Sequence, residues 1–139
     1  MITAVDSSVL IDVFGADVTF GTRSASVLRR CLSDGAVIAC EIVWSETAVV
    51  FEHEHDFLQA MRTLRVDFSA IEQKAALRSA RAWRRYLGHG GRGQGVVADF
   101  LIGGHAVEQA DRLLTRDRGF YRDYFTSLRL LDPSSEASR

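Results

Sequence analysis

The stretch Ile2–Asp12, ITAVDSSVLID, decides how the rest of the chain is organised. It begins with a short apolar run containing β-branched side chains, which predicts a buried strand. The run ends at Asp6 and a helical pattern follows at once, with the hydroxyls of Ser7 and Ser8 predicted to cap the helix N-terminus. Asp6 is therefore expected at the carboxyl end of a first strand, the edge where ligands bind in open α/β sheets.

Strand and helix patterns alternate along the remaining chain. Further strands are predicted over 36–40, 66–68, 112–115 and 128–131, and helices over 8–14, 22–33, 41–53, 56–65, 69–87, 96–109 and 117–125. A capping box of Ser69 and Glu72 is expected to open the longest helix. Four glycines within residues 89–95 predict a flexible loop. The alternation predicts an α/β fold with a parallel sheet covered on both faces.

Length and composition are those of one globular domain. The chain has 139 residues, 47% of them hydrophobic and 25% charged, with a net charge of −1. No apolar run approaches the roughly 18 residues of a membrane span, and no export signal is visible at the N-terminus. Cys31 and Cys40 lack metal-ligand spacing and are expected to be reduced core residues. We expect a cytoplasmic protein with one domain over residues 1–132 and a disordered tail over 133–139.

Four acids are predicted at equivalent places in this fold. Asp117 repeats the pattern of Asp6, because it follows an apolar strand and opens a helix. Glu46 lies about one turn into the helix after the second strand. Asp99 interrupts the most apolar helix of the chain, although a carboxylate is rarely buried without a partner. The carboxyl ends of parallel strands share one edge of a sheet, so these acids are expected to meet there.

Clustered carboxylates repel one another, and a bound cation removes the repulsion. Carboxylate ligands suit a hard divalent ion, which indicates Mg²⁺ or Mn²⁺. Such an ion lowers the pKa of a bound water and neutralises charge on a phosphoryl group, which points to phosphodiester hydrolysis. A structural interpretation competes for each acid taken singly: Asp6 and Asp117 also suit helix caps, and Glu46 suits a solvated helix face.

At this point the sequence resembles PIN-domain ribonucleases, and most closely the VapC toxins of bacterial toxin–antitoxin pairs. The resemblance rests on VDSSVLID at 5–12, IVWSE at 42–46, DFLIGGHA at 99–106 and LLTRD at 113–117, in the family's order. It spans residues 2 to about 131. The first and last of these motifs are the more specific.

The resemblance implies a three-layer α/β/α sandwich and a Mg²⁺- or Mn²⁺-dependent endoribonuclease acting on structured RNA such as transfer RNA. Asp6, Glu46, Asp99 and Asp117 would form the acidic quartet, with Asp6, Asp99 and Asp117 holding the metal. Thr115 matches a supporting hydroxyl position, and Ser7 is a second candidate. The resemblance also implies a homodimer and a cognate antitoxin. Gly119 stands where many members have a further acid, so a second metal site is not implied.

Basic residues are concentrated between residues 62 and 92. This stretch contains eight of the 17 Lys and Arg residues and only two acidic residues. Arg81 and Arg85 share a helical stripe there, and Arg92 lies in the glycine loop. These three arginines and Arg116, beside Asp117, are candidate RNA contacts. The competing interpretations are a solvated helix face for the stripe and an ion pair with a neighbouring acid for Arg116.

The sequence therefore predicts a metal-dependent endoribonuclease. Two alternatives remain open: a metal-dependent phosphohydrolase acting on small phosphates, and a non-catalytic RNA-binding regulatory module.

Overall fold

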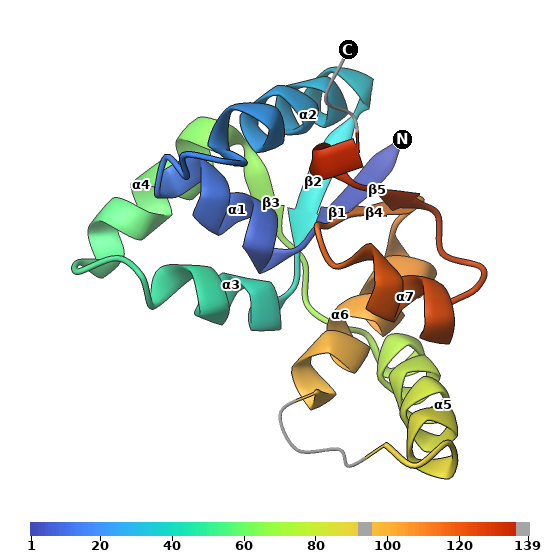
Figure 1. The fold of residues 1–139 in the computed structure, drawn as a ribbon. Coiled ribbons are helices and arrows are strands. Elements are labelled where there is room, and N and C mark those ends of the chain that lie inside the picture. Colours follow the sequence, from blue (N-terminus) through green and yellow to red (C-terminus); the bar gives the residue numbers. More distant parts are fainter. Residues whose placement is uncertain (92–95, 136–139) are drawn as a thin grey trace.

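The computed structural model describes residues 1–91 and 96–135, which form a five-stranded sheet between two layers of helices (Figure 1). All pairings are parallel and the strand order is β3-β2-β1-β4-β5. The strands are β1 (Ile2–Val5), β2 (Ala36–Ala39), β3 (Val66–Phe68), β4 (Arg112–Leu114) and β5 (Leu130–Leu131). The predicted three-layer α/β/α sandwich with a central parallel sheet is confirmed.

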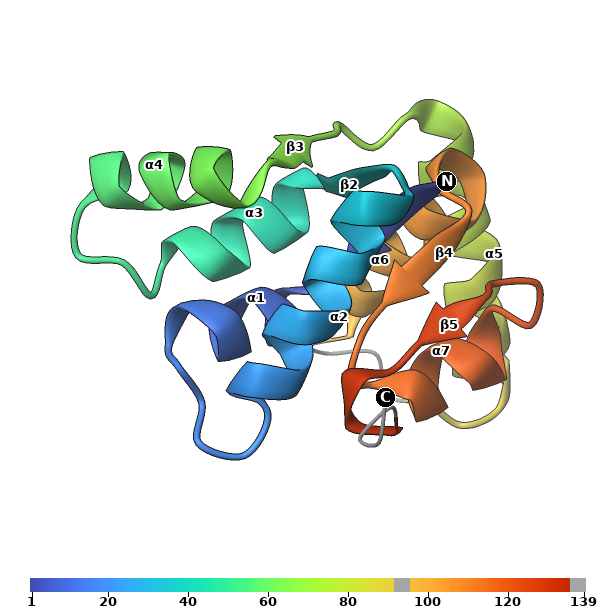
Figure 2. The same ribbon diagram turned by 90° about the horizontal axis from the view of Figure 1, so that it is seen from above.

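Two groups of helices cover the two faces of this sheet. The helices are α1 (Ser7–Phe14), α2 (Gly21–Asp34), α3 (Glu41–Ala48), α4 (Glu54–Leu64), α5 (Gln73–Gly88), α6 (Val97–Gln109) and α7 (Arg118–Tyr124). The chain steps from β1 to β2 to β3 through α1–α4, then crosses back through α5 and α6 to β4 and through α7 to β5. Because such crossovers are right-handed, opposite directions place helices on opposite faces. Figure 2 shows α2 and α5 well apart on either side of the strands.

The chain adds β2 and β3 on one side of β1 and then adds β4 and β5 on the other side. This change of side places a topological switch point between β1 and β4. One chain segment leaves the carboxyl end of β1 toward β2, and another leaves the end of β4 toward β5. In open α/β sheets the crevice at such a point is where ligands bind. Val5 pairs with Leu114 there, and both side chains are fully buried in the core.

Helix starts differ from the predicted ones at two places. The residue that caps α1 is Asp6, whose carboxylate accepts a hydrogen bond from the Ser7 backbone N–H, and neither Ser7 nor Ser8 is the cap. The Ser69–Glu72 capping box is wrong as well, because α5 begins at Gln73. Ser69 instead contacts His105, with 3.0 Å between Oγ and Nε2. A local cap motif was outcompeted by a tertiary contact.

Two segment boundaries also differ. The helix predicted over 41–53 ends at Ala48, and α4 begins at Glu54. Residues 133–135 of the expected disordered tail form a short 3-10 helix in which Pro133 is buried, and residues 136–139 lie outside the described residues. The glycine loop lies partly outside them too, at 92–95.

The cysteines and helices agree with the remaining expectations. Cys31 and Cys40 are buried free thiols, as predicted. Within residues 1–91 and 96–135, none of the helices combines the length and apolar character required to span a membrane.

Candidate active site

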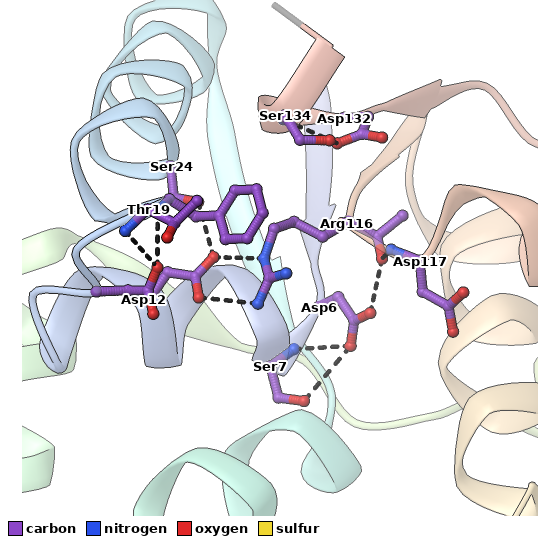
Figure 3. Close-up of polar contacts among 12 residues, drawn as sticks. Asp6, Ser7, Asp12, Thr19, Ser24, Arg116, Asp117, Asp132 and Ser134 are labelled. Carbon is purple, nitrogen blue, oxygen red and sulfur yellow. Dashed lines mark hydrogen bonds and ion pairs between the residues drawn. The ribbon is translucent and has the colours of Figure 1, made fainter. Parts of the chain in front are cut away.

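Asp6 and Asp117 lie at the carboxyl ends of the two strands that flank the switch point (Figure 3). The Asp6 backbone N–H donates to the Leu114 carbonyl at 2.9 Å, which extends the β1–β4 ladder up to the acid. Asp6 is buried and Asp117 is exposed. At the switch point, one acid therefore lies inside the fold and the other at its surface.

Thr115 connects these two acids. Its hydroxyl donates to Asp6 Oδ2 at 2.7 Å and accepts a hydrogen bond from the Asp117 backbone N–H at 2.9 Å. Thr115 is fully buried, so its side chain has little freedom to leave this arrangement. The hydroxyl holds Asp6 in one orientation and fixes the turn that presents Asp117.

Ser7 connects Asp6 to Glu46. The Ser7 backbone N–H donates to Asp6 Oδ1 at 2.8 Å, and the Ser7 hydroxyl donates to Glu46 Oε1 at 2.9 Å. Glu46 comes from α3, after β2, so this hydroxyl joins acids from two neighbouring strand–helix junctions. Asp6 is thus both the α1 cap and the centre of a polar network, and the structural and functional interpretations of this residue are compatible.

Asp99 completes the cluster from the first turn of α6. Partial burial and, in decreasing order, the carboxylates of Asp6, Asp117 and Glu46 together raise the pKa of its carboxyl to about 6. Burial likewise raises the pKa of Asp6, against the opposing hydrogen bonds from Thr115 and Ser7. The pKa values of Asp99 and Asp6 therefore both reflect neighbouring carboxylates in addition to burial.

Tyr121 lies beside this cluster and was not singled out from the sequence. The residue is fully buried in α7, and its hydroxyl has no hydrogen-bond partner among the described residues. Burial raises the pKa of the Tyr121 phenol well above its ordinary value, and Asp6, Asp99, Asp117 and Glu46 all act in the same direction. A buried donor without a partner is unusual, so this hydroxyl is available to a group bound among the acids.

Comparison with protein families identifies the chain. The family model described as PIN domain matches residues 3–125 and includes all four acids. The chain belongs to the PIN-domain family. A comparison with curated protein sequences found no match.

Solved structures share the fold of this PIN domain at low sequence identity. VapBC2 from Rickettsia felis, bound to a promoter DNA fragment, has a TM-score of 0.74 at 14% identity, covering 95% of this chain and 98% of that one. VapBC-1 from nontypeable Haemophilus influenzae has a TM-score of 0.73 at 16% identity, covering 96% and 99%. VapC20 from Mycobacterium tuberculosis, described as a sarcin–ricin loop cleaving toxin, has a TM-score of 0.59 at 16% identity, covering 91% and 98%.

Arg116 is held by an ion pair with Asp12. Its Nε and a terminal nitrogen bind the two carboxylate oxygens of Asp12 at 2.6 and 3.0 Å, and its guanidinium carbon lies 4.2 Å from the centre of the Phe20 ring. Ser24 donates to the same carboxylate at 3.0 Å. The sequence left open whether Arg116 contacts RNA or pairs with an acid. In the structure, Arg116 forms an ion pair with Asp12. Asp12 lies on the buried face of α1 with Val9 and Leu10. An acid among the apolar positions of a helix is the sequence feature that could have indicated a buried ion pair.

The other candidate RNA contacts lie on or after α5. Arg81 is exposed on the helix surface, and Arg85 donates a hydrogen bond to the Tyr124 carbonyl at the end of α7. Arg92 is outside the described residues. Neither Arg81 nor Arg85 contacts the four acids directly.

The four acids of this PIN domain supply the donor atoms that a divalent ion requires. The donors are carboxylate and hydroxyl oxygens, the set that Mg²⁺ and Mn²⁺ prefer. The pKa of Asp99 is raised by burial and then by the carboxylates of Asp6, Asp117 and Glu46, and the Tyr121 hydroxyl has no hydrogen-bond partner among the described residues. Across the described ranges, however, no three His, Cys, Asp or Glu side chains converge closely enough to hold a metal ion. The donor chemistry fits the ion, and binding would require the carboxylates to move closer together.

Proposed function

We propose that this PIN domain is a VapC-type endoribonuclease that depends on Mg²⁺ or Mn²⁺. The observation that carries the proposal is the electrostatic coupling of Asp6, Glu46, Asp99 and Asp117 at the switch point of the sheet. Like charges gathered at a ligand-binding edge cost stability, and a divalent cation offsets that cost. Family membership supports the same conclusion.

Asp6, Asp99 and Asp117 are the proposed metal ligands. A cation held by them would supply a more acidic water and neutralise charge that develops on the phosphoryl group. Thr115 and Ser7 act as supporting residues, because their hydrogen bonds favour the ionised form of Asp6 and fix its orientation. Glu46 is not among the proposed ligands and is left to accept a proton from the attacking water.

RNA is the proposed substrate, and a protein antitoxin and a second copy of the chain are the proposed partners. Two of the similar structures are complexes designated VapBC, and a third is a toxin described as cleaving the sarcin–ricin loop. These relatives support a structured RNA as substrate and a cognate antitoxin as inhibitor, acting in the cytoplasm. Dimer formation is tested by the mass of the purified protein in solution.

The proposal is tested by incubating the purified protein with total bacterial RNA in Mg²⁺ or in EDTA. Discrete fragments are expected from the wild type in Mg²⁺ and from neither the wild type in EDTA nor Asp99→Asn. Asp123→Asn is the matched control, because it removes a carboxylate from an exposed position of α7 outside the cluster, and it is expected to cleave like the wild type. Cleavage by Asp99→Asn at the wild-type rate would contradict the proposal.

Two further readouts separate the alternatives. Phosphate release from a generic aryl phosphate, without RNA fragments, would indicate a phosphohydrolase. A mobility shift of RNA that is unaffected by Asp99→Asn and occurs without cleavage would indicate a binding module.

A further inference from the structure

A hollow lined by arginines lies between α5 and the segment that follows α7. Its volume is about 390 Å³, and it is lined by Arg78, Arg81, Arg84 and Arg85 on one side and by Thr126 and Ser127 on the other. Helices α5 and α7 lie side by side in Figure 1 and contact each other. No acidic side chain lines this hollow in the described part of the chain. The hollow therefore gathers four positive charges, away from the acids of the candidate active site.

Internal contacts account for two of the four arginines. Arg78 Nε binds Glu108 Oε1 at 3.1 Å, and Arg85 donates to the Tyr124 carbonyl. Arg81 and Arg84 are both exposed and make no hydrogen bond or ion pair with any described residue. Their guanidinium groups are therefore available to an external ligand.

The spacing of the arginines costs helix stability. Arg81 is three residues from both Arg78 and Arg84, and four from Arg85, so it neighbours all three on the helix surface. Like charges at these spacings repel and destabilise a helix. The helix dipole favours a cation in the last turn of α5, which explains Arg85 but not the charges before it. A bound anion would remove the repulsion.

We propose that this hollow binds backbone phosphates of the RNA strand, away from the point where the strand is cut. The inference rests on the proposed function. Planar guanidinium groups bind phosphate oxygens in pairs, and the Thr126 and Ser127 hydroxyls are further donors. Asp117 precedes α7 and the hollow lies at its other end, about 10 Å away for a helix of this length. One strand crossing α7 therefore reaches both, which favours RNA over an acidic protein segment.

The test measures RNA binding without cleavage. Fluorescence anisotropy of a labelled, mixed-sequence single-stranded RNA is recorded in EDTA over a range of salt concentrations, with Asp99→Asn present in every protein. Three pairs of substitutions are added to that background. They are Arg81→Gln with Arg84→Gln, Arg81→Lys with Arg84→Lys, and the control Arg29→Gln with Arg62→Gln. The control removes two exposed positive charges from α2 and α4, on the other face of the sheet.

Removing the charges of Arg81 and Arg84 is expected to weaken RNA binding about tenfold at about 0.15 M salt, and to make the slope of log affinity against log salt shallower by about 1.4. The lysine pair keeps the charges and loses the planar fork, so it should keep the slope and lose less affinity. The control pair should change neither quantity.

The inference would be overturned if the glutamine pair bound RNA as well as the protein without it, or if the glutamine pair and the control pair lost equal affinity for RNA. As a further comparison, the affinity for polyglutamate is measured in the same proteins. A loss of polyglutamate affinity in the glutamine pair equal to its loss of RNA affinity would also overturn the inference. The last outcome would assign the hollow to acidic protein segments. Because the assay needs neither metal nor cleavage, a wild type that fails to cut RNA would refute the proposed function and leave this inference standing. A wild type that cuts RNA, with an unaffected glutamine pair, would refute this inference alone.

Discussion

Asp99 is the residue at which the cost of the acidic cluster is most accessible to measurement. Its carboxyl is half-buried in the first turn of α6, where burial and three other carboxylates raise its pKa from 3.8 to about 6. In the absence of metal, Asp99→Asn is expected to raise the free energy of unfolding at pH 7 by about 1 kcal/mol, because solvent screens part of the repulsion at a half-buried group. Urea denaturation in EDTA measures this difference.

The pH dependence of the Asp99→Asn effect has a defined sign. At pH values between 3.8 and about 6, the folded protein keeps a proton on Asp99 that the unfolded chain releases, so wild-type stability falls as pH rises through this window. The stabilisation by Asn should therefore be near zero at the acidic end and complete above about pH 6. Asp123→Asn, at an exposed position, is the control and should change stability by less than about 0.5 kcal/mol. An equal gain from Asn at both ends of the window would contradict the assignment.

The pair of Asp12 and Arg116 is expected to stabilise the turn that presents Asp117. The Asp12 side chain is 4% exposed, and removal of its charge leaves the partly buried guanidinium of Arg116 without its carboxylate. Asp12→Ala should lower the free energy of unfolding by about 3 kcal/mol. Arg122→Ala removes one partner of an exposed pair with Asp123 and should cost at most about 1 kcal/mol. Similar losses of unfolding free energy in the two variants would show that the buried pair stabilises the fold no more than the exposed pair.

The residues of the site differed in how far the sequence could identify them. Asp6 was recognisable from its place at the end of a predicted strand, and Thr115 from a motif that resembles those of PIN domains. Tyr121 was not, because its role depends on burial beside four acids that lie far from it in sequence. Asp12 appeared in the first motif, yet its partner is 104 residues away, and only the fold joins them.

Close packing of α6 on α5 is the feature of the helical layer that is most sensitive to substitution. A Cβ atom at Gly104 would lie 2.0 Å from Ser79 Oγ and 2.5 Å from the Ala75 backbone oxygen, so α5 would have to move. Gly104→Ala is expected to lower the free energy of unfolding by about 1–3 kcal/mol, measured by thermal or urea denaturation.

Gly119 in α7 provides the matched control for Gly104. A Cβ there would meet no atom of the described chain within 4 Å. Gly119→Ala should be neutral or stabilising by up to about 1 kcal/mol, because alanine is the better helix former. If Gly104→Ala were equally harmless, the contact between α5 and α6 would be looser than its geometry indicates.

At the level of elements, the sequence predicted which helices and strands exist better than where they begin. Hydrophobic periodicity depends on many residues, so each strand and α-helix of the described residues was recognised. Boundaries depend on single hydrogen bonds that compete with tertiary contacts. Ser69 illustrates this, because its hydroxyl contacts His105 and α5 starts four residues later. Pro133 illustrates it too, since this residue of a segment expected to be disordered is buried in a short 3-10 helix.

For the whole molecule, the reversal of strand order at the parallel pair β1 and β4 organises the candidate site. It brings Asp6 and Asp117 together although 111 positions separate them, and it places α5 and α7 on the face where the arginine-lined hollow opens. The alternation of strands and helices predicted a parallel sheet, and the resemblance to PIN domains implied its type. The hollow required the structure, because its two walls come from distant segments.

Manganese binding tests the central claim, that Asp6, Asp99 and Asp117 hold a divalent ion, most directly. Mn²⁺ titrated into the wild type, Asp99→Asn and Asp123→Asn would be followed by electron paramagnetic resonance, which detects the free ion. The account predicts binding by the wild type and Asp123→Asn, and at least tenfold weaker binding by Asp99→Asn, because one proposed carboxylate ligand is lost. Equal Mn²⁺ affinity in all three proteins would contradict the account and place the metal elsewhere.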